Sequence, residues 1–295
     1  MFKLFGKKKA ETSSSTPLQE QQPTVQPKHP EAAALAAQFG TEEFEILAVT
    51  GANRFGGEKA PDASYWTATL PLTAWREGDG PIHQEDTCLM ALADDTLLEY
   101  LRRRAPKDSI IQARVRQGLE DHRFLLVGLP TPIMDAELKV ILDEQVKEIS
   151  HWVEGLGTFT LNRSVNWFQA DIEWLGQGIQ LVYDNGTEAE QKSAQETAQI
   201  LMSDQAHWDE VVRRYAADSL LSLANDYVQN EGTEEEESQP VTREDFTQRM
   251  ELDSLQVWGD DRFAFWFQDA ELFWGHAIQV SGTLTGGPNN AQMEE

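Results

Sequence analysis

The stretch Asp261–His276, DRFAFWFQDAELFWGH, decides how the C-terminal half of this chain folds. Alternate residues of a β-strand point to the same face, and the phenylalanines of RFAFWFQ occupy alternate positions. Phe263, Phe265 and Phe267 are therefore predicted to share one face, with the alanine and tryptophan between them on the other. Aromatic side chains favour such pleated surfaces, and both faces are apolar. We expect an interior strand that is covered on both faces, on one of them by a helix.

The polar residues of the same stretch allow a second interpretation. Asp269, Glu271 and His276 supply two carboxylates and an imidazole, which can hold a divalent metal or act in acid–base catalysis, with Asp260 or Asp261 in support. Their spacing matches neither the His pair of zinc proteases nor a calcium loop. In the structural interpretation the two acids form a turn and the histidine bonds to backbone. We favour the structural interpretation and expect no metal and no cofactor.

Composition limits the class of protein. The chain has 295 residues, of which 40% are hydrophobic and 9% aromatic, enough to fold around one large or two ordinary cores. Its single cysteine excludes an internal disulfide framework and suits a reducing compartment. It contains no apolar run of about 18 residues, the length that a membrane-spanning helix needs. We therefore expect a cytoplasmic protein.

The chain contains many more acidic than basic residues. The formal net charge is −26, and because the first nine residues carry four lysines and no acid, the other 286 carry −30. Such a body repels phosphate backbones and attracts basic proteins, so we expect a basic protein partner and no direct nucleic-acid binding. The N-terminal tip allows at most a weak contact with an anionic membrane surface. The residues available for that contact are Phe2, Lys3, Leu4, Phe5, Lys7, Lys8 and Lys9.

The N-terminal part of the chain divides into a leader and a β-rich domain. Residues 1–30 are rich in Ser, Thr, Gln and Pro, which is typical of a disordered segment. A β-rich domain is predicted over 31–131, beginning with an alanine-rich helix after Pro30. Its strands are expected at 44–50, 64–72, 87–92, 109–115 and 123–129, with a short helix at 96–106.

A second domain is predicted after a linker. Apolar residues at helical spacing predict a linker helix over 132–155, followed by a C-terminal domain over 156–285 and a polar tail over 286–295. Strands are expected at 157–162, 165–175, 178–184, 251–258, 262–268 and 276–282, and helical structure over 188–227. The predicted fold class is α+β, with two β-rich domains whose antiparallel sheets are partly covered by helices and joined by the linker helix.

Three tryptophans are candidates for a binding surface. Trp167 and Trp174 lie seven residues apart on one predicted strand, so they should point to opposite faces, and Trp274 follows the aromatic strand. An aromatic side chain left exposed can anchor a protein partner. The alternative for each of the three is a place in the core, which we favour for the two on the strand.

Three stretches of the C-terminal half also carry a family resemblance. LGTFTLNRSVNWFQADIEWLGQGIQL, AADSLLSLANDY and LFWGHAIQVSG lie within 156–284, a region that resembles the bacterial family called domain of unknown function 2262. Residues 44–130 resemble the smaller domain that often precedes it. Members of that family usually carry glycine at the position of Ala270. The resemblance implies a bacterial cytoplasmic protein and assigns no catalytic residue.

Two functions from different classes follow from these observations. The first is a non-catalytic interaction or regulatory protein, such as an inhibitor or immunity-type protein for a basic partner, because the charge is high and no catalytic motif is recognised. The second is a hydrolase that uses Asp269, Glu271 and His276, with or without a metal. Convergence of these three side chains in a pocket would favour the second function over the first.

Overall fold

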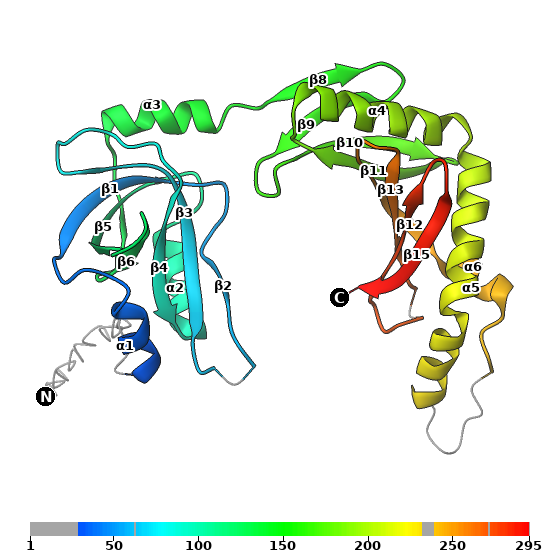
Figure 1. Cartoon of the computed structure of the whole chain (residues 1–295), viewed down its shortest axis with the longest axis horizontal. Helices are drawn as coiled ribbons and strands as arrows, with labels where there is room; N and C mark the ends of the chain where they lie inside the picture. The colour runs from blue at the N-terminus through cyan, green and yellow to red at the C-terminus, as the bar shows by residue number, and fades with distance from the viewer. Residues whose placement is uncertain (1–28, 62, 232–238, 271, 295) are drawn as a thin grey trace, which may run out of the picture. The chain divides into compact units, whose positions relative to one another are not determined.

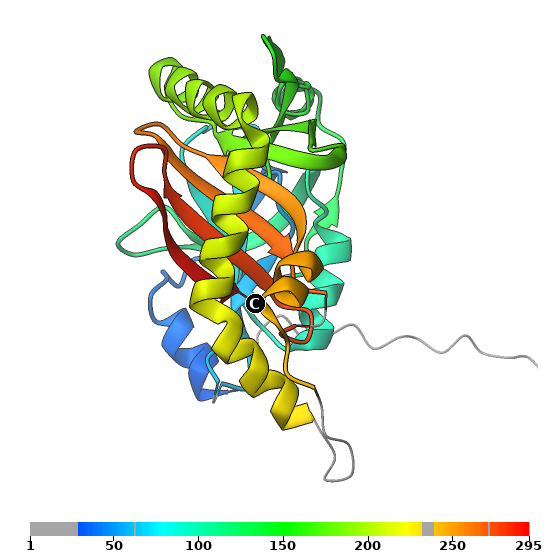
Figure 2. The same cartoon turned by 90° about the vertical axis from the view of Figure 1, so that its right-hand side faces the viewer.

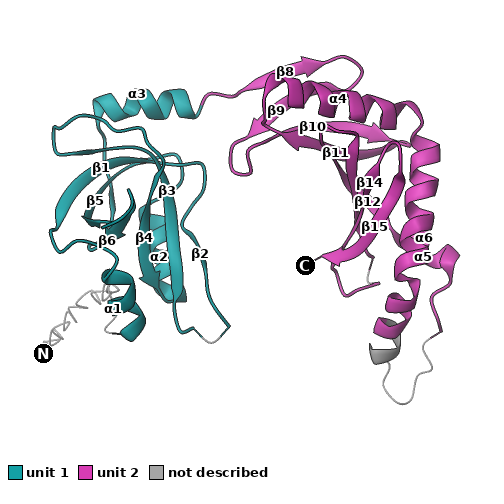
Figure 3. Ribbon diagram, viewed as in Figure 1, with its two compact units in different colours: residues 1–146 teal, residues 147–295 magenta. Residues whose placement is uncertain are grey.

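The computed structural model describes residues 29–61, 63–231, 239–270 and 272–294. The chain divides into two compact units, residues 1–146 and residues 147–295 (Figure 3). Each unit contains a β-sheet with helices packed on it (Figure 1), which confirms the predicted α+β class with two β-rich regions. The predicted leader, including its basic tip, lies outside the described residues up to residue 28.

Unit 1 is built around a closed barrel. Its strands are β1 (Phe44–Thr50), β2 (Gly56–Glu58), β3 (Trp66–Glu77), β4 (Thr87–Ala93), β5 (Ile110–Gln117), β6 (Phe124–Leu126) and β7 (Thr131–Pro132). Its helices are α1 (Pro30–Ala36), α2 (Asp95–Arg104) and α3 (Ala136–Gln145). The sheet runs in the order β1-β3-β4-β6-β5, and β5 pairs again with β1. This last pairing closes the ring and leaves none of the five strands at an open edge.

The order of the ring identifies its topology. Numbered within the barrel, the five strands follow one another around it as 1-2-3-5-4-1, with the third and fifth parallel. Helix α2 connects the third strand to the fourth and buries Leu97, Leu98 and Leu101 in the barrel core. This is the connectivity of the OB fold, a small Greek-key barrel. A shared fold does not by itself assign a function.

The predicted linker helix is wrong in its length, and the shorter helix α3 belongs to unit 1. The helix predicted over 132–155 extends only from Ala136 to Gln145, and it packs on β1, β3 and β5 of unit 1. Asp135 caps its N-terminus by accepting a hydrogen bond from the backbone N–H of Leu138 at 2.9 Å, and Leu138 is its fully buried residue. Residues 150–153 of the predicted helix form a strand instead. The apolar residues of this segment therefore belong to two different elements.

Unit 2 contains an eight-stranded sheet. Its strands are β8 (Ser150–Val153), β9 (Gly157–Asn162), β10 (Trp167–Trp174), β11 (Gln177–Asp184), β12 (Glu251–Val257), β13 (Arg262–Gln268), β14 (Ala277–Thr283) and β15 (Gly287–Glu294). The strands lie in the order β15-β14-β13-β12-β11-β10-β9-β8. The pair β11–β12 is parallel and the other pairings of this sheet's described strands are antiparallel. Each sheet thus departs from the predicted antiparallel arrangement by one parallel pair, β4–β6 in unit 1 and β11–β12 here.

The parallel pair follows from the helical insertion between its strands. The chain leaves β11, passes through α4 (Glu188–Ser203), α5 (Gln205–Glu231) and α6 (Arg243–Arg249), and returns to β12. Parallel neighbours require a long crossover of this kind. Helix α5 lies across the strands of the sheet (Figure 2) and contacts β14 and β15.

The aromatic strand β13 forms the predicted interior of unit 2. Phe263, Phe265 and Phe267 are at most 1% exposed and belong to one core with residues of α4, α5 and α6. On the opposite face Ala264 is buried, whereas Trp266 is half-buried, so the second face is less covered than predicted. The strand lies third from the β15 edge, between β12 and β14.

The prediction of a polar tail at residues 286–295 is also wrong. The residues expected to form a polar tail, 286–295, contain strand β15, which pairs with β14 over its length. Ala291 and Met293 pack against the core, while Asn290 and Gln292 are exposed. The polar composition reflects an edge strand with one solvent-facing side. Among the described residues, no helix combines the length and apolar character needed to cross a membrane.

Candidate functional site

The connection between β13 and β14, residues 269–276, is named here the Trp274 loop. Asp269 is 3% exposed, and its Oδ2 accepts hydrogen bonds from the backbone N–H groups of Phe273 at 2.6 Å and Gly275 at 3.2 Å. Leu272 and Phe273 are fully buried in the unit 2 core. A buried carboxylate that accepts backbone N–H groups fixes the path of the chain around it. The loop is therefore a packed and bonded turn.

Several residues of the loop adopt the left-handed backbone region. The φ angles are +42° at Ala270, +60° at Trp274 and +88° at Gly275. Glycine adopts this region without steric cost, whereas a bulky side chain with positive φ is uncommon and strained. The carbonyl of Ala270 accepts hydrogen bonds from the guanidinium of Arg249, at 3.1 Å from Nε.

The strained residue Trp274 presents its side chain to solvent. Trp274 is 50% exposed, although the residue before it is fully buried. Its ring centroid lies 4.8 Å from that of Tyr227 on α5, which also contacts Phe273 at 5.5 Å. Leu223, one helical turn before Tyr227, is 37% exposed. The loop and the last described turns of α5 thus form a partly exposed aromatic patch.

The described members of the predicted catalytic cluster, Asp269 and His276, bond to backbone groups of their own loop. The carboxylate of Asp269 binds loop N–H groups, and Nδ1 of His276 contacts the carbonyl oxygen of Phe273. Glu271 lies outside the described residues. The supporting acids serve turns, because Asp261 accepts a hydrogen bond from the hydroxyl of Thr285 at 2.8 Å. Within the described parts of the chain, no three His, Cys, Asp or Glu side chains are placed to hold a metal ion.

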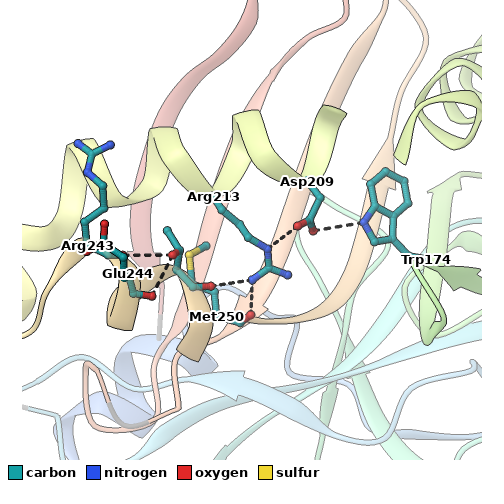
Figure 4. A network of polar contacts seen from close by, with 7 residues as sticks. Trp174, Asp209, Arg213, Arg243, Glu244 and Met250 are labelled. Atoms are coloured by element: carbon teal, nitrogen blue, oxygen red, sulfur yellow. Dashed lines mark hydrogen bonds and ion pairs between the residues drawn. The ribbon is translucent and has the colours of Figure 1, made fainter. Parts of the chain in front are cut away.

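The two tryptophans of β10 occupy opposite faces, as predicted from their spacing. Trp174 is 1% exposed and cannot serve as a binding surface, since it packs edge-on against Phe265 in the core. Its Nε1 donates a hydrogen bond to Asp209 of α5 at 3.3 Å (Figure 4). Trp167 is half-buried. Its Nε1 has no hydrogen-bond partner among the described residues.

A polar network extends from Trp174 to the end of α6 (Figure 4). The other oxygen of Asp209 accepts a hydrogen bond from Nε of Arg213 at 2.7 Å. The guanidinium also donates to the backbone carbonyls of Thr247, at 3.1 Å, and Met250. The last carbonyls of a helix have no partner within it, so Arg213 satisfies groups that α6 leaves free. The network holds the end of α6 in place, and Arg249 at the same helix end bonds to the carbonyl of Ala270 in the Trp274 loop.

A second polar cluster was not predicted from the sequence. Nε2 of His151 on β8 lies 2.6 Å from the hydroxyl of Tyr183 on β11, and Gln195 of α4 donates to that hydroxyl at 2.9 Å. Burial lowers the pKa of His151 and raises the pKa of Tyr183 to about 12. His151 borders an open pocket of about 430 Å³ with Gln195 and Lys192. No local pattern indicated this cluster, because His151 lay within the predicted linker helix.

Comparison with known protein families assigns both units. Residues 153–293 match the family described as "Uncharacterized protein conserved in bacteria (DUF2262)". Unit 2 is a DUF2262 domain. The match begins at the last residue of β8 and includes nearly all of β15, so it extends beyond the predicted 156–284 at both ends. Residues 31–145 match a domain of unknown function called DUF7021. Neither a curated protein nor a solved structure matches the chain.

These matches confirm the resemblance and refine the domains. The DUF7021 match includes α3, in agreement with the packing of that helix on the unit 1 sheet. The DUF2262 match contains the Trp274 loop and the Arg213 network, whereas His151 precedes its first residue. Neither family description names a ligand, a partner or a reaction.

Proposed function

We propose that this protein is a non-catalytic interaction or regulatory protein that binds a basic protein partner through its DUF2262 domain. The observation that carries the proposal is the charge of unit 2. Residues 147–295 contain 28 Asp and Glu against 8 Lys and Arg, a formal charge of −20 out of the chain's −26. Such a surface steers association with cationic proteins and discriminates against anionic ones.

Four cations of unit 2 are held by nearby acids or by backbone. Arg213 pairs with Asp209 at 2.7 Å, Arg262 lies 3.3 Å from Asp260, and Arg243 pairs with Asp218. Arg249 bonds to a backbone carbonyl of the Trp274 loop. Exposed acids such as Asp171 and Glu173 on β10 stay available to a partner.

The hydrolase alternative receives no support from the described residues. Asp269 and His276 interact with backbone groups of their own loop, which is the role that the structural interpretation predicts. A catalytic pair would instead direct its polar atoms at a shared position in a pocket.

The test is a pull-down with the full chain as bait in bacterial lysate, at low and high salt. The captured protein is then identified, purified and measured against the full chain by surface plasmon resonance. We expect a basic protein whose association slows by roughly tenfold between low and physiological salt, because charge steers the encounter. A neutral or acidic protein, or binding insensitive to salt, would contradict the proposal.

Two variants with matched charge changes test which unit carries the acids that attract the partner. One carries Asp171→Asn, Glu173→Gln, Asp184→Asn and Glu196→Gln in the DUF2262 domain, all at exposed positions. The other carries four substitutions at exposed acids of unit 1, Glu42→Gln, Glu77→Gln, Asp79→Asn and Asp86→Asn. The first variant should associate several-fold more slowly at low salt, and the second should behave like the wild type. Equal effects would show that the DUF2262 domain has no special role.

A further inference from the structure

The Trp274 loop holds an aromatic side chain at the surface against the backbone's preference. Trp274 has a φ of +60° and an exposed fraction of 50%, whereas the neighbouring Phe273 is fully buried. The hydrophobic effect favours burying an indole, and sterics disfavour a bulky residue in the left-handed region. Neither folding preference explains this arrangement. Backbone strain that the surrounding structure maintains occurs often at binding sites.

Hydrogen bonds and a ring contact also constrain the loop around that side chain. Asp269 fixes the N–H groups on both sides of Trp274, those of Phe273 and Gly275. Arg249 holds the carbonyl of Ala270, and Tyr227 supports one side of the indole. A group that is ordered before binding loses less conformational entropy when a partner is bound.

Acidic residues lie near the Trp274 loop on the flanking strands. Glu251 of β12 pairs with Gln268, the residue before the loop, and Glu294 of β15 pairs with Ala277, the residue after it. Asp226 is exposed beside Tyr227. The nearby cation Arg249 is bonded to the loop itself. Asp226 is thus an exposed acid beside the aromatic patch, whereas Glu251 and Glu294 lie at the same end of the sheet on the face opposite to that of Phe267 and Ile278.

From this geometry we infer that Trp274 is the anchor of the interface with the basic partner, an inference that rests on the proposed function. The partner presents an apolar recess that receives the indole, with Lys or Arg side chains beside it that face Asp226 and are attracted by the charge of −20 on the unit. Tryptophan is enriched among the few interface residues that carry most of the binding free energy. Surrounding charges mainly set the association rate and specificity.

The experiment compares Trp274→Ala with Trp152→Ala, using the purified partner captured by the wild type. Trp152 is a matched control, because it lies in the same unit, on β8, and is 68% exposed. We expect Trp274→Ala to raise the Kd at least about 30-fold, chiefly through faster dissociation, and Trp152→Ala to change it less than about threefold. Both variants should bind poly-L-lysine like the wild type, because that probe senses charge alone. Far-ultraviolet circular dichroism checks that both variants fold.

The outcomes separate this inference from the proposed function. If the wild type captures no basic protein, both are overturned. If it captures one and Trp274→Ala binds it as tightly as the wild type does, the anchor is overturned and the proposed function stands. A loss of poly-L-lysine binding by Trp274→Ala would also overturn the anchor, since its effect would then be electrostatic or structural. Self-association of the wild type that Trp274→Ala abolishes would assign the patch to a second copy of this chain and overturn the inference.

Discussion

Arg76 in unit 1 and Arg213 in unit 2 are both largely buried and both hold a helix end in place, but their partners differ. Arg76 on β3 binds two carboxylates at the start of α3, those of Asp135 and Glu137, each at 2.5 Å. Arg213 on α5 binds one carboxylate, Asp209, together with the backbone carbonyls of Thr247 and Met250 at the end of α6. One arginine therefore depends on ionised acids and the other mostly on peptide groups.

This difference predicts how the stability of each unit changes as the pH falls. Carboxylates lose their charge as the pH falls, whereas backbone carbonyls accept hydrogen bonds at any pH. The pKa of Asp135 is lowered by the backbone N–H of Leu138 and by the Arg76 guanidinium, so its ionised form is favoured in the folded unit. Unit 2 has a further reason to tolerate mild acid, because protonation reduces the repulsion within a charge of −20. Four predictions test this comparison.

The largest effect is expected for Arg213→Ala. The substitution removes the donors to two helix-end carbonyls and leaves Asp209, whose side chain is 15% exposed, without its cation. We expect the free energy of unfolding of unit 2 to fall by about 3 kcal/mol, measured by urea denaturation. Arg214→Ala is the control, because that side chain is 55% exposed and its pair with Glu210 is 3.7 Å long. Similar losses for the two variants would contradict the role of the network.

Asp135→Asn tests the acid-dependent side of the comparison. Asparagine can still cap α3 but carries no charge for Arg76, so unit 1 should lose about 1 kcal/mol at neutral pH. The carboxylate's contribution is present above its unfolded pKa of about 3.9 and is lost as the pH falls through the lower folded pKa. The difference between variant and wild type should therefore shrink below pH 4. Hydrogen exchange of the α3 amides measures this stability difference. A difference that stays constant as the pH falls would contradict the stabilising role of the Asp135 carboxylate.

Trp274→Gly and Trp274→Ala together measure the strain in the loop. Both remove the indole, but glycine has no Cβ to clash at a φ of +60°. The glycine variant should therefore be more stable than the alanine variant by about 1 kcal/mol in urea denaturation, opposite to the order found at ordinary loop positions. Partner binding should be equally weak for both. An alanine variant of equal or greater stability would show that position 274 is unstrained.

The smallest effect is expected for the His151 cluster. Burial lowers the pKa of His151, so the unfolded chain takes up a proton at a higher pH, near 6.5, than the folded unit does. Its contribution to stability is complete above that value and is lost as the pH falls towards the folded pKa. Between pH 7 and pH 5 the wild type should lose up to about 1 kcal/mol more than His151→Phe. Replacing the exposed His207 with glutamine should leave the pH dependence unchanged.

Most strands could be predicted from the sequence because their patterns are local. The strands predicted at 44–50, 157–162 and 262–268 correspond to β1, β9 and β13 with the same bounds. The errors occurred where tertiary pairing overrides a local pattern. Strand β15 is polar and is held by β14, and β8 continues an apolar pattern that began as a helix. Barrel closure through β1 and β5 could not be predicted, since it joins strands far apart in the sequence.

In the candidate site, too, the local features could be predicted from the sequence and the tertiary features could not. The sequence marked Asp269 as a turn former and Trp274 as a possible surface residue, because both follow a strongly patterned strand. It could not show that Trp174 is buried, since that depends on α5 crossing the sheet. The left-handed backbone at Trp274 carries no sequence signal, because tryptophan is not a residue that favours it.

The last strand has a practical meaning for anyone who shortens this chain. Deletion after residue 285 would uncover the backbone donors and acceptors that β14 now shares with β15, together with Ile278 and Val280 on its inner face. An exposed apolar edge of that kind recruits strands from other molecules. The truncated protein should therefore form insoluble aggregates or exchange strands between copies, and expression trials should retain the final ten residues.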